Sequence, residues 1–387
     1  MVRPILALAL ALVSAGPACA HHRQTPPVVQ FNKEGDADLT RASAADGAFA
    51  TVLVTPTDRT VVRYKLLGAD ATVVIAESGQ NGDPSVSFNG SSVAYMSEAD
   101  PLGLGLPGQQ VYQRTSSALT LVSQDPTGTS TNPVVSANGK LVAFESRGDM
   151  ASTGNSGAQQ VFVYQAGRGL QQVSRGLGRS GNASLDKAGK NITFESTSDP
   201  ATWLDAGTAQ VWHTYLLTGE AHRITSGLGV SRKPAISVEG QVIVFESTAD
   251  LAGTGADTGI PQIFAHDLKS GTTARITEDA TGCTDPSVHR FRTDWRIGFM
   301  CGGQPYFYLL RADQRSRIQV DGGETSRVLM GMGPQFLLVS TTAPLLTGGT
   351  TPTADRRVYL VNLYHRPAEV VPGTAVWFPT RGITPLH

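Results

Sequence analysis

The feature that most constrains the fold is an internal repeat. The tripeptide Phe-Glu-Ser begins at Phe144, Phe194 and Phe245, so its copies are 50 and 51 residues apart. The residues around it repeat as well, as "NPVVSANGKLVAFES", "NASLDKAGKNITFES" and "KPAISVEGQVIVFES". A period of about 40 to 50 residues is typical of proteins whose repeats bury a core only by stacking against their neighbours.

Each repeat has the pattern of a four-stranded antiparallel meander. Two apolar segments flank Asn138-Gly139, a dipeptide typical of tight hairpins, and two more short strands follow as "QQVFVYQ" and "LQQVS". The same order recurs from Asp83, Asn182 and Lys233, and more weakly in one unit before and two units after these. The pattern predicts seven units, with hairpin turns at Gly47, Gly90, Gly139, Gly189, Gly240, about Thr293 and Gly333.

The second strand of a repeat is apolar on both faces. In "LVAF" and "VIVF" successive residues point to opposite sides of a sheet, and all of them are apolar. Such a strand must be covered on both sides, as in sheets packed radially like blades. We therefore expect an all-β protein, a β-propeller of four-stranded blades. Seven blades are favoured, and six are expected if the first or last unit is only a closing strand.

One aromatic position recurs in that second strand. We expect it to wedge between adjacent blades. The residues at this position are Tyr95, Phe144, Phe194, Phe245 and Phe299.

The N-terminus resembles a secretory signal peptide, with Arg3, a short apolar run and Ala18-Cys19-Ala20. We expect cleavage after residue 20, a single propeller over residues 28–378 and a tail at 379–387. A lipid attached to Cys19 is the alternative. The ends of a ring must be joined, and "PVVQF" and "TAVWFP" are the candidates.

The charge pattern excludes some partners. Thirty-one basic and 32 acidic residues occur without a basic cluster, so nucleic acid is not expected to bind. No segment after the signal peptide is long and apolar enough to span a bilayer. The sequence indicates a periplasmic or secreted protein.

Two cysteines remain after cleavage, Cys283 and Cys301. Their midpoint falls in "RFRTDW", the turn between two apolar strands. Residues equidistant from a hairpin turn face one another, and disulfides persist in oxidising compartments. We predict a disulfide. The alternative is a pair of buried free thiols.

The repeats resemble those of the TolB-like, WD-repeat-related bacterial propellers. The matching residues are Asn132, Pro133, Ser136, Asn138, Gly139, Ala143, Phe144, Pro234, Ser237, Gly240, Phe245, Gln262, Ile263, Phe264, Ile276 and Thr277. The resemblance implies a periplasmic or secreted protein, many of whose relatives are docking surfaces for other proteins. It is a strong indication of fold and a weak one of function, because propellers host binders and enzymes alike. We expect a monomer.

A related group of propellers carries a Ser-x-x-Asp motif and a later acidic residue that together ligate calcium. The first part is present as Ser97/Asp100, Ser146/Asp149, Ser196/Asp199 and Ser247/Asp250. The place of the acidic residue is taken by Gln110, Gln160, Gln210 and Gln262. A neutral amide is a poor ligand for calcium by itself, so no cofactor is expected, and the Ser/Asp pairs are expected to close turns.

Glu145, Glu195 and Glu246 follow the repeated phenylalanine and are candidates for a binding rim. An acidic arc of this kind suits a cation or a basic partner, and its simpler interpretation is a solvated strand end. Gly-x-Ser-x-Gly, His-Glu-x-x-His, Cys-x-x-Cys and phosphate-loop motifs are missing, and no catalytic residue is assigned.

The function favoured by the sequence is a non-enzymatic docking module that binds a protein or a cell-envelope component. The alternative is an enzyme, a lyase or hydrolase acting on a saccharide or peptide at the mouth of the central channel. A third interpretation is a purely structural role.

Overall fold

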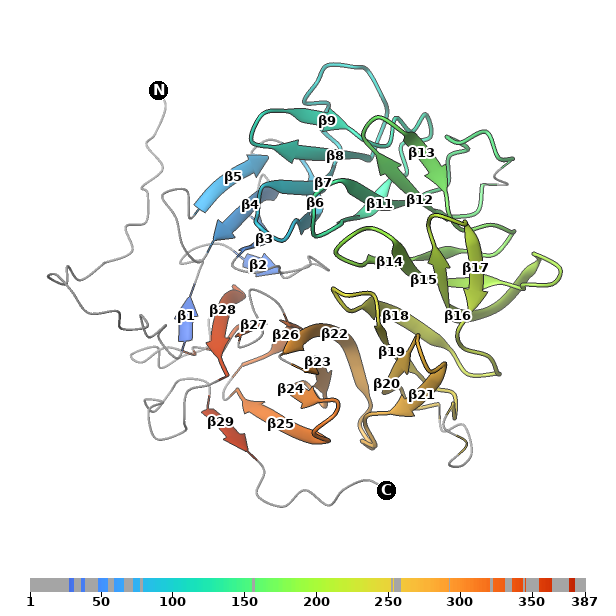
Figure 1. Cartoon of the computed structure of the whole chain (residues 1–387). Helices are drawn as coiled ribbons and strands as arrows, with labels where there is room; N and C mark the ends of the chain where they lie inside the picture. The colour runs from blue at the N-terminus through green and yellow to red at the C-terminus, as the bar shows by residue number, and fades with distance from the viewer. Residues whose placement is uncertain are drawn as a thin grey trace, which may run out of the picture.

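The computed structural model describes residues 28–30, 36–38, 48–54, 59–65, 72–76, 79–154, 157–251, 253, 259–291, 293–320, 323–330, 336–343, 345, 355–363 and 376–379. Within these ranges the regular secondary structure is entirely β. The strands form seven antiparallel sheets set around a central axis, and the chain visits them in order around the ring (Figure 1). The predicted seven-bladed β-propeller is confirmed.

Blades 1 to 4 follow one another in sequence, and in each of them the first strand along the chain is the innermost. Blade 1 contains β2 (Asp36–Asp38), β3 (Ala48–Val54), β4 (Arg59–Lys65) and β5 (Thr72–Ala76). Blade 2 contains β6 (Asn81–Val86), β7 (Ser92–Ser97), β8 (Gln110–Thr115) and β9 (Leu119–Leu121). Blade 3 contains β10 (Thr131–Val135), β11 (Leu141–Ser146), β12 (Gln160–Gln165) and β13 (Gly169–Gln172). Blade 4 contains β14 (Ser180–Leu185), β15 (Asn191–Ser198), β16 (Asp205–Tyr215) and β17 (Glu220–Arg223).

Blades 5 to 7 complete the ring. Blade 5 contains β18 (Ser231–Ile236), β19 (Val242–Ser247), β20 (Gln262–Asp267) and β21 (Thr272–Arg275). Blade 6 contains β22 (Cys283–Phe291), β23 (Asp294–Cys301), β24 (Gln304–Leu309) and β25 (Gln314–Gln319), with β29 (Val376–Pro379) as a fifth strand. Blade 7 contains β26 (Thr325–Met330), β27 (Phe336–Thr341) and β28 (Arg357–Asn362), with β1 (Val28–Gln30) as its outermost strand.

The ring is closed by the N-terminal strand. β1 pairs antiparallel with β28, with Val29 opposite Leu360, so the first described strand completes blade 7 (Figure 1). The prediction that "PVVQF" seals the ring is confirmed. The prediction for "TAVWFP" is wrong, because β29 pairs with β25 at the outer edge of blade 6. The repeat order also predicts a fourth strand for the last unit at "AEVVP", and this segment lies outside the described residues.

The core lies between the blades. The second strands β11 and β19 are buried along their whole length, as their two apolar faces require. Phe144 packs with Ala94 and Val111 of blade 2, and Phe194 packs with Ala143 of blade 3. The recurring aromatic residue therefore wedges between neighbouring blades, as predicted.

Each of these rings also stacks on the aromatic residue opposite it on the third strand. The ring centroids lie 5.0 to 6.4 Å apart in six blades. The pairs are Phe49–Tyr64, Tyr95–Tyr112, Phe144–Phe162, Phe194–Trp212, Phe245–Phe264 and Phe299–Tyr306.

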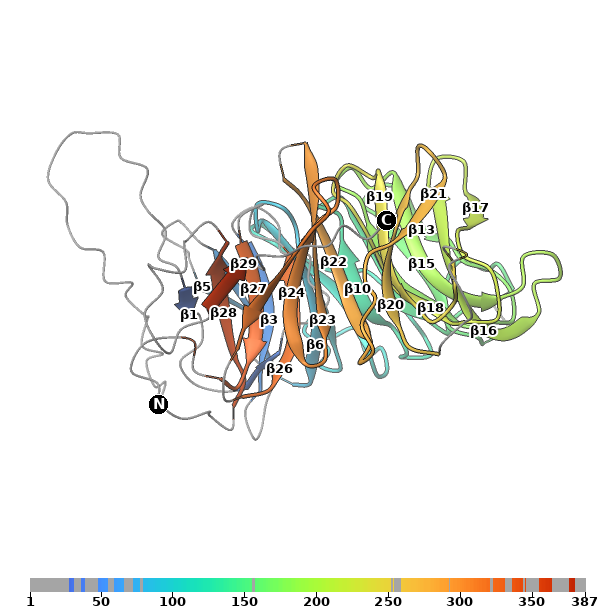
Figure 2. The ribbon, with the colours of Figure 1, turned by 90° about the horizontal axis from the view of Figure 1, so that it is seen from below.

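The meander gives the ring two different faces, at the two ends of the strands (Figure 2). Connections from second to third strand, and from fourth strand to the next blade, all lie at one end, which we call the loop face. Hairpins between first and second, and between third and fourth strands, lie at the other end, the turn face. At the turn face, Gly139 has a φ of +74°, which suits glycine, and its N–H donates to Ser136 O.

Candidate functional site

The innermost strands share an irregularity near the loop face. In β10, β14, β18 and β22 the pairing register shifts after the first or second residue. The residue at the shift has a positive φ: Asn132, Asn182, Lys233 and Asp285 at +48°, +56°, +49° and +56°. Each is thus a β-bulge that turns a backbone N–H away from its own sheet.

The three candidate rim glutamates bind these bulges. Glu145 accepts a hydrogen bond from Asn182 N at 2.6 Å. Glu195 and Glu246 accept from Lys233 N at 2.8 Å and Asp285 N at 3.0 Å. Each carboxylate therefore satisfies a backbone donor of the following blade.

This geometry corrects the expectation of a solvated acidic arc. The three residues do lie at equivalent places on consecutive blades, but Glu145 and Glu246 are buried, with 2% and 4% of their surface exposed. A carboxylate at this depth needs partners, and the next blade supplies them. The hypothesis that the three glutamates bind an external cation or a basic partner stays a prediction.

The glutamines at equivalent positions on the third strands of blades 2 to 5 form a second repeated network. Gln160 is fully buried, its Oε1 accepts from Ser174 Oγ, and its Nε2 donates to Gly176 O and Gly178 O. Gln210 makes the equivalent bonds to Thr225 Oγ1, Gly227 O and Gly229 O. Two donors directed at carbonyl oxygens are something a carboxylate cannot provide. The amide in this place therefore ties down the loop to the next blade.

The Ser/Asp pairs close turns, as predicted for them. Ser146 Oγ accepts from Gly148 N, and Asp149 accepts from Thr153 N and Gly154 N. Asp199 accepts from Ala201 N and Thr202 N, and these backbone hydrogen bonds lower its pKa.

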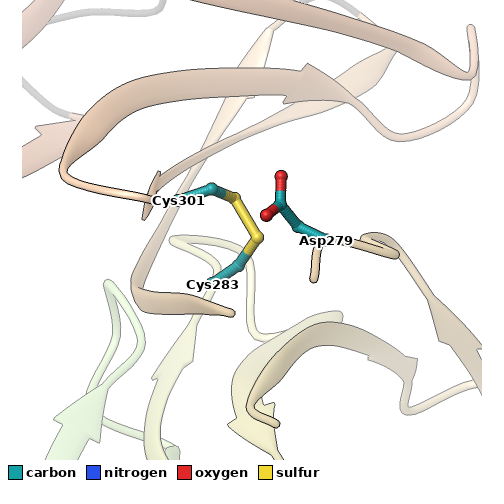
Figure 3. A group of neighbouring side chains, drawn as sticks. All are labelled: Asp279, Cys283 and Cys301. Atoms are coloured by element: carbon teal, nitrogen blue, oxygen red, sulfur yellow. A yellow bond between two sulfur atoms is a disulfide. The ribbon is translucent and has the colours of Figure 1, made fainter. Parts of the chain in front are cut away.

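Cys283 and Cys301 form the predicted disulfide (Figure 3). They are directly opposite each other on β22 and β23, with Cα atoms 4.2 Å apart. Asp279 lies beside the two sulfurs (Figure 3), and the three side chains have a spacing that suits a metal. The Asp279 carboxylate, however, accepts from Thr281 and forms an ion pair with Arg315 at 3.2 Å. With its sulfurs bonded to each other, this group is a structural crosslink.

The central channel contains a cavity of about 120 Å³. Its walls come from the innermost strands of blades 3 to 7 and are mainly apolar, with Val135, Leu185, Ile236 and Leu329 among the lining residues. Lys233, Asp285, His289 and Arg327 add charged or titratable groups.

The ionic groups of the channel pair with one another. Lys233 Nζ lies 2.8 Å from Asp285 Oδ1 and 3.6 Å from Glu246 Oε2. Burial acts to raise the pKa of Asp285, but the hydrogen bond and charge of Lys233 and the charge of Arg327 outweigh it, and the pKa is lowered. Burial raises the pKa of Glu246, against the opposing effect of Lys233. The cluster therefore contains two carboxyl groups beside the Lys233 ammonium, and their pKa values are shifted in opposite directions.

The loop face carries exposed apolar side chains. In the described part of the chain, six of the seven large exposed hydrophobic residues lie in loop-face connections, and only Leu217 lies in a turn-face hairpin. The six are Leu102, Leu104, Leu177, Trp203, Leu204 and Leu228. Our sequence interpretation missed them. The available signal was large apolar residues inside polar, glycine-rich loops such as "RGLGRS", "SGLGVS" and "TWLDAG".

Fold and site together define a seven-bladed β-propeller with a cavity in its central channel and exposed apolar side chains in its loop-face connections. No protein-family model and no curated protein matches its sequence. No helix in the described ranges has the length and apolar character to cross a bilayer.

Solved structures match it as a fold. The β-propeller domain of the Trilobed protease from Pyrococcus furiosus has a TM-score of 0.57 at 11% identity, covering 84% of this chain and 95% of that one. Oligogalacturonate lyase from Vibrio parahaemolyticus has a TM-score of 0.57 at 6% identity, with 87% and 93% covered. TolB from Acinetobacter baumannii also matches, at 16% identity and a TM-score of 0.45, with 86% of this chain and 66% of the TolB chain covered. At these identities the likeness is one of fold.

Proposed function

We propose that this chain is a non-enzymatic propeller that docks a protein partner on its loop face. The observation that carries the proposal is the gathering of exposed apolar side chains there, including Leu228 at 96% and Leu177 at 51% exposed. Exposed apolar surface of this kind on a rigid scaffold is typical of protein interaction sites. Acidic and basic residues are balanced over the chain, so we expect the partner to be recognised mainly through apolar contacts.

We also propose a periplasmic or secreted location after removal of residues 1–20. The Cys283–Cys301 disulfide supports this, since such bonds persist in oxidising compartments. Residues 1–20 themselves lie outside the described residues. The proposed single domain spans residues 28–378, with the ring closed through β1, and the proposed tail, residues 379–387, begins at Pro379, the last residue of β29, which pairs with Ser316.

Site-specific photo-crosslinking tests the docking proposal. A photoreactive residue replaces Leu177 or Leu228 on the loop face, or Leu217, 80% exposed, on the turn face as the matched control. In cell-envelope extract we expect one discrete crosslinked protein from the loop-face positions, competed away by unmodified protein. Equal crosslinking from Leu217, or none from any loop-face position, contradicts the proposal.

The second candidate is an enzyme that acts on a saccharide or peptide at the channel mouth. The observation in its favour is the cluster of Lys233, Asp285 and Glu246, where burial raises the pKa of Glu246, the direction that a proton donor needs. Turnover of an oligosaccharide or peptide that is lost in Glu246→Gln and Lys233→Met would reverse our ranking.

A further inference from the structure

One exposed aromatic residue on the loop face is held in an unusual backbone conformation. Trp203, 42% exposed, has a φ of +59°, a left-handed value that bulky residues rarely adopt. Its N–H donates to Asp199 O at 2.8 Å, and its carbonyl accepts from Leu177 N at 2.8 Å. Such a conformation costs on the order of 1 kcal/mol or more and persists only where the surroundings enforce it. The loop between β15 and β16 therefore holds the backbone of Trp203 in a fixed place, from which the indole projects.

Trp203 borders a groove between blades 3 and 4. The groove has a volume of about 230 Å³ and is lined by Val173, Arg175, Phe194, Trp203, Trp212 and Glu220, among others. The rings of Trp203 and Trp212 stack with centroids 6.4 Å apart. The exposed indole thus forms one wall of the groove.

One wall residue of the groove, Trp212, carries an unused hydrogen-bond donor. Trp212 is 2% exposed, and its Nε1 is shielded from solvent without a hydrogen-bond partner among the described residues. A buried donor without an acceptor destabilises a fold by about 1–3 kcal/mol. An acceptor brought by a ligand would remove that cost, so this N–H favours an occupant that carries a carbonyl or similar oxygen.

The surroundings of the groove indicate the class of occupant. Leu177 and Leu204, 51% and 55% exposed, adjoin Trp203 in sequence or through the hydrogen bond above. Arg175 and Glu220 add one charge of each sign, which suits a neutral ligand. An apolar residue of a polypeptide meets these requirements, because it is uncharged and combines apolar surface with a nearby acceptor, its own main-chain carbonyl.

We propose that this groove receives an apolar side chain of a partner polypeptide, whose adjacent carbonyl accepts from Trp212 Nε1. Trp203 shifts to admit it, as interface side chains commonly do on binding. The exposed leucines then flank the bound segment. This inference rests on the proposed docking function and identifies the pocket and the kind of residue that anchors the partner.

Capped tetrapeptides Ala-Xaa-Ala-Ala, with Leu, Phe or Ser at Xaa, are the probes. The readout is the indole N–H signals of the four tryptophans in the nuclear magnetic resonance spectrum, assigned by single Trp→Phe variants. We expect the Leu and Phe peptides to shift the Trp203 and Trp212 signals saturably at millimolar concentration, and the Ser peptide to have no effect. The Trp295 signal, which belongs to blade 6, should stay unchanged.

Two variants test the roles of the two indoles. Trp212→Phe keeps an aromatic ring against Phe194 but removes the donor together with the second ring of the indole, so we expect affinity to fall about tenfold. Trp203→Ala should abolish binding. Leu204→Ala should weaken it, while Leu104→Ala, a leucine of nearly equal exposure (56%) on blade 2, is the matched control and should bind like the wild type.

The inference is overturned if no peptide shifts the two signals, if the Ser peptide acts like the others, or if Trp203→Ala binds normally. A response to chitotetraose in place of the peptides would make the groove a saccharide site. A further outcome is that Leu228→Glu abolishes the crosslink to the partner while Trp203→Ala leaves it unchanged. That result would support docking on the loop face and show that the groove is not the binding site. If no loop-face variant changes partner binding, the docking function itself fails.

Discussion

The carboxylate of Glu145 on β11 accepts a hydrogen bond from the backbone N–H of Asn182 on β14, 37 residues later and one blade further round the ring. Glu195 and Glu246 repeat the relationship with Lys233 and Asp285. The apolar contacts between neighbouring blades are not directional. These hydrogen bonds are directional, and they fix the position of one blade relative to the next along the axis of the ring. The repeated glutamate therefore fixes how neighbouring blades of the ring are aligned.

Glu145→Ala should destabilise the protein by about 1–3 kcal/mol, because Asn182 N and the side-chain amide of Asn132 lose a buried acceptor. Chemical denaturation measures the change in the free energy of unfolding. Glu239→Ala, which removes an exposed carboxylate on a turn-face hairpin, should stay within about 0.5 kcal/mol of the wild type. Equal effects of the two substitutions would show that the inter-blade hydrogen bonds contribute nothing specific.

Gln160→Glu should destabilise the chain and do so more strongly as the pH rises. The new carboxylate faces Gly176 O and Gly178 O, which accept from the amide in the wild type. Only a protonated carboxyl donates to a carbonyl, so the pKa of the new side chain is raised and its destabilisation is smallest at low pH. Unfolding free energies at pH 4.5 and 7.5 measure this. Gln171→Glu on the exposed side of β13 should show no such trend.

Replacing both cysteines, as in Cys283→Ala with Cys301→Ala, should lower the free energy of unfolding by about 3 kcal/mol. The bond closes a short loop, with the cysteines 18 positions apart, and crosslinking restricts the unfolded chain. Reductant should lower the stability of the wild type toward that of the double variant. A wild type whose unfolding is unaffected by reductant, with two titratable thiols after denaturation, would mean that the disulfide does not form.

The blades were predictable because many residues repeat together. Phe144 and its equivalents recur with the apolar strands that need cover on both faces, and only a closed ring of sheets supplies that cover to every copy. That Cys283 and Cys301 lie close together was predictable too, because antiparallel residues at similar distances from a turn face one another, although a register shift between Thr284 and Ser287 is needed to set the two directly opposite.

The fate of the glutamates was harder to predict. The strand pattern places Glu145 at the end of β11, but its burial depends on a bulge in another blade. For the bulges at Lys233 and Asp285, which bind Glu195 and Glu246, the signal was the proline that follows each, since proline inside a strand indicates an edge or a bulge. Asn182, which binds Glu145, is followed by alanine and carries no such signal. The groove at Trp203 depends on the connection from β15 to β16, which is shorter than its equivalents in blades 2, 3 and 5 and whose path no period specifies. Sequence repeats determine what the blades share, and the site lies where one blade differs.

His213 should make stability depend on pH between about 4 and 6.5. Burial, with smaller contributions from the charges of His222 and His266, lowers its pKa from 6.5 to about 4. In this window the unfolded chain binds the proton that the folded chain excludes. Stability therefore falls as the pH drops below 6.5, by up to about 1.4 kcal/mol per pH unit, and levels off below 4.

His213→Gln tests this assignment. The amide replaces the ring Nε2, which lies 3.0 Å from Asn191 Oδ1, as a hydrogen-bond donor that does not titrate. Denaturant unfolding at intervals from pH 4.5 to 7 should show a flatter profile for the variant than for the wild type. The carboxylates with lowered pKa, such as Asp125 and Asp285, lose their contribution only as the pH falls below 3.8, outside this window. A variant with an unchanged slope would mean that another group takes up the proton.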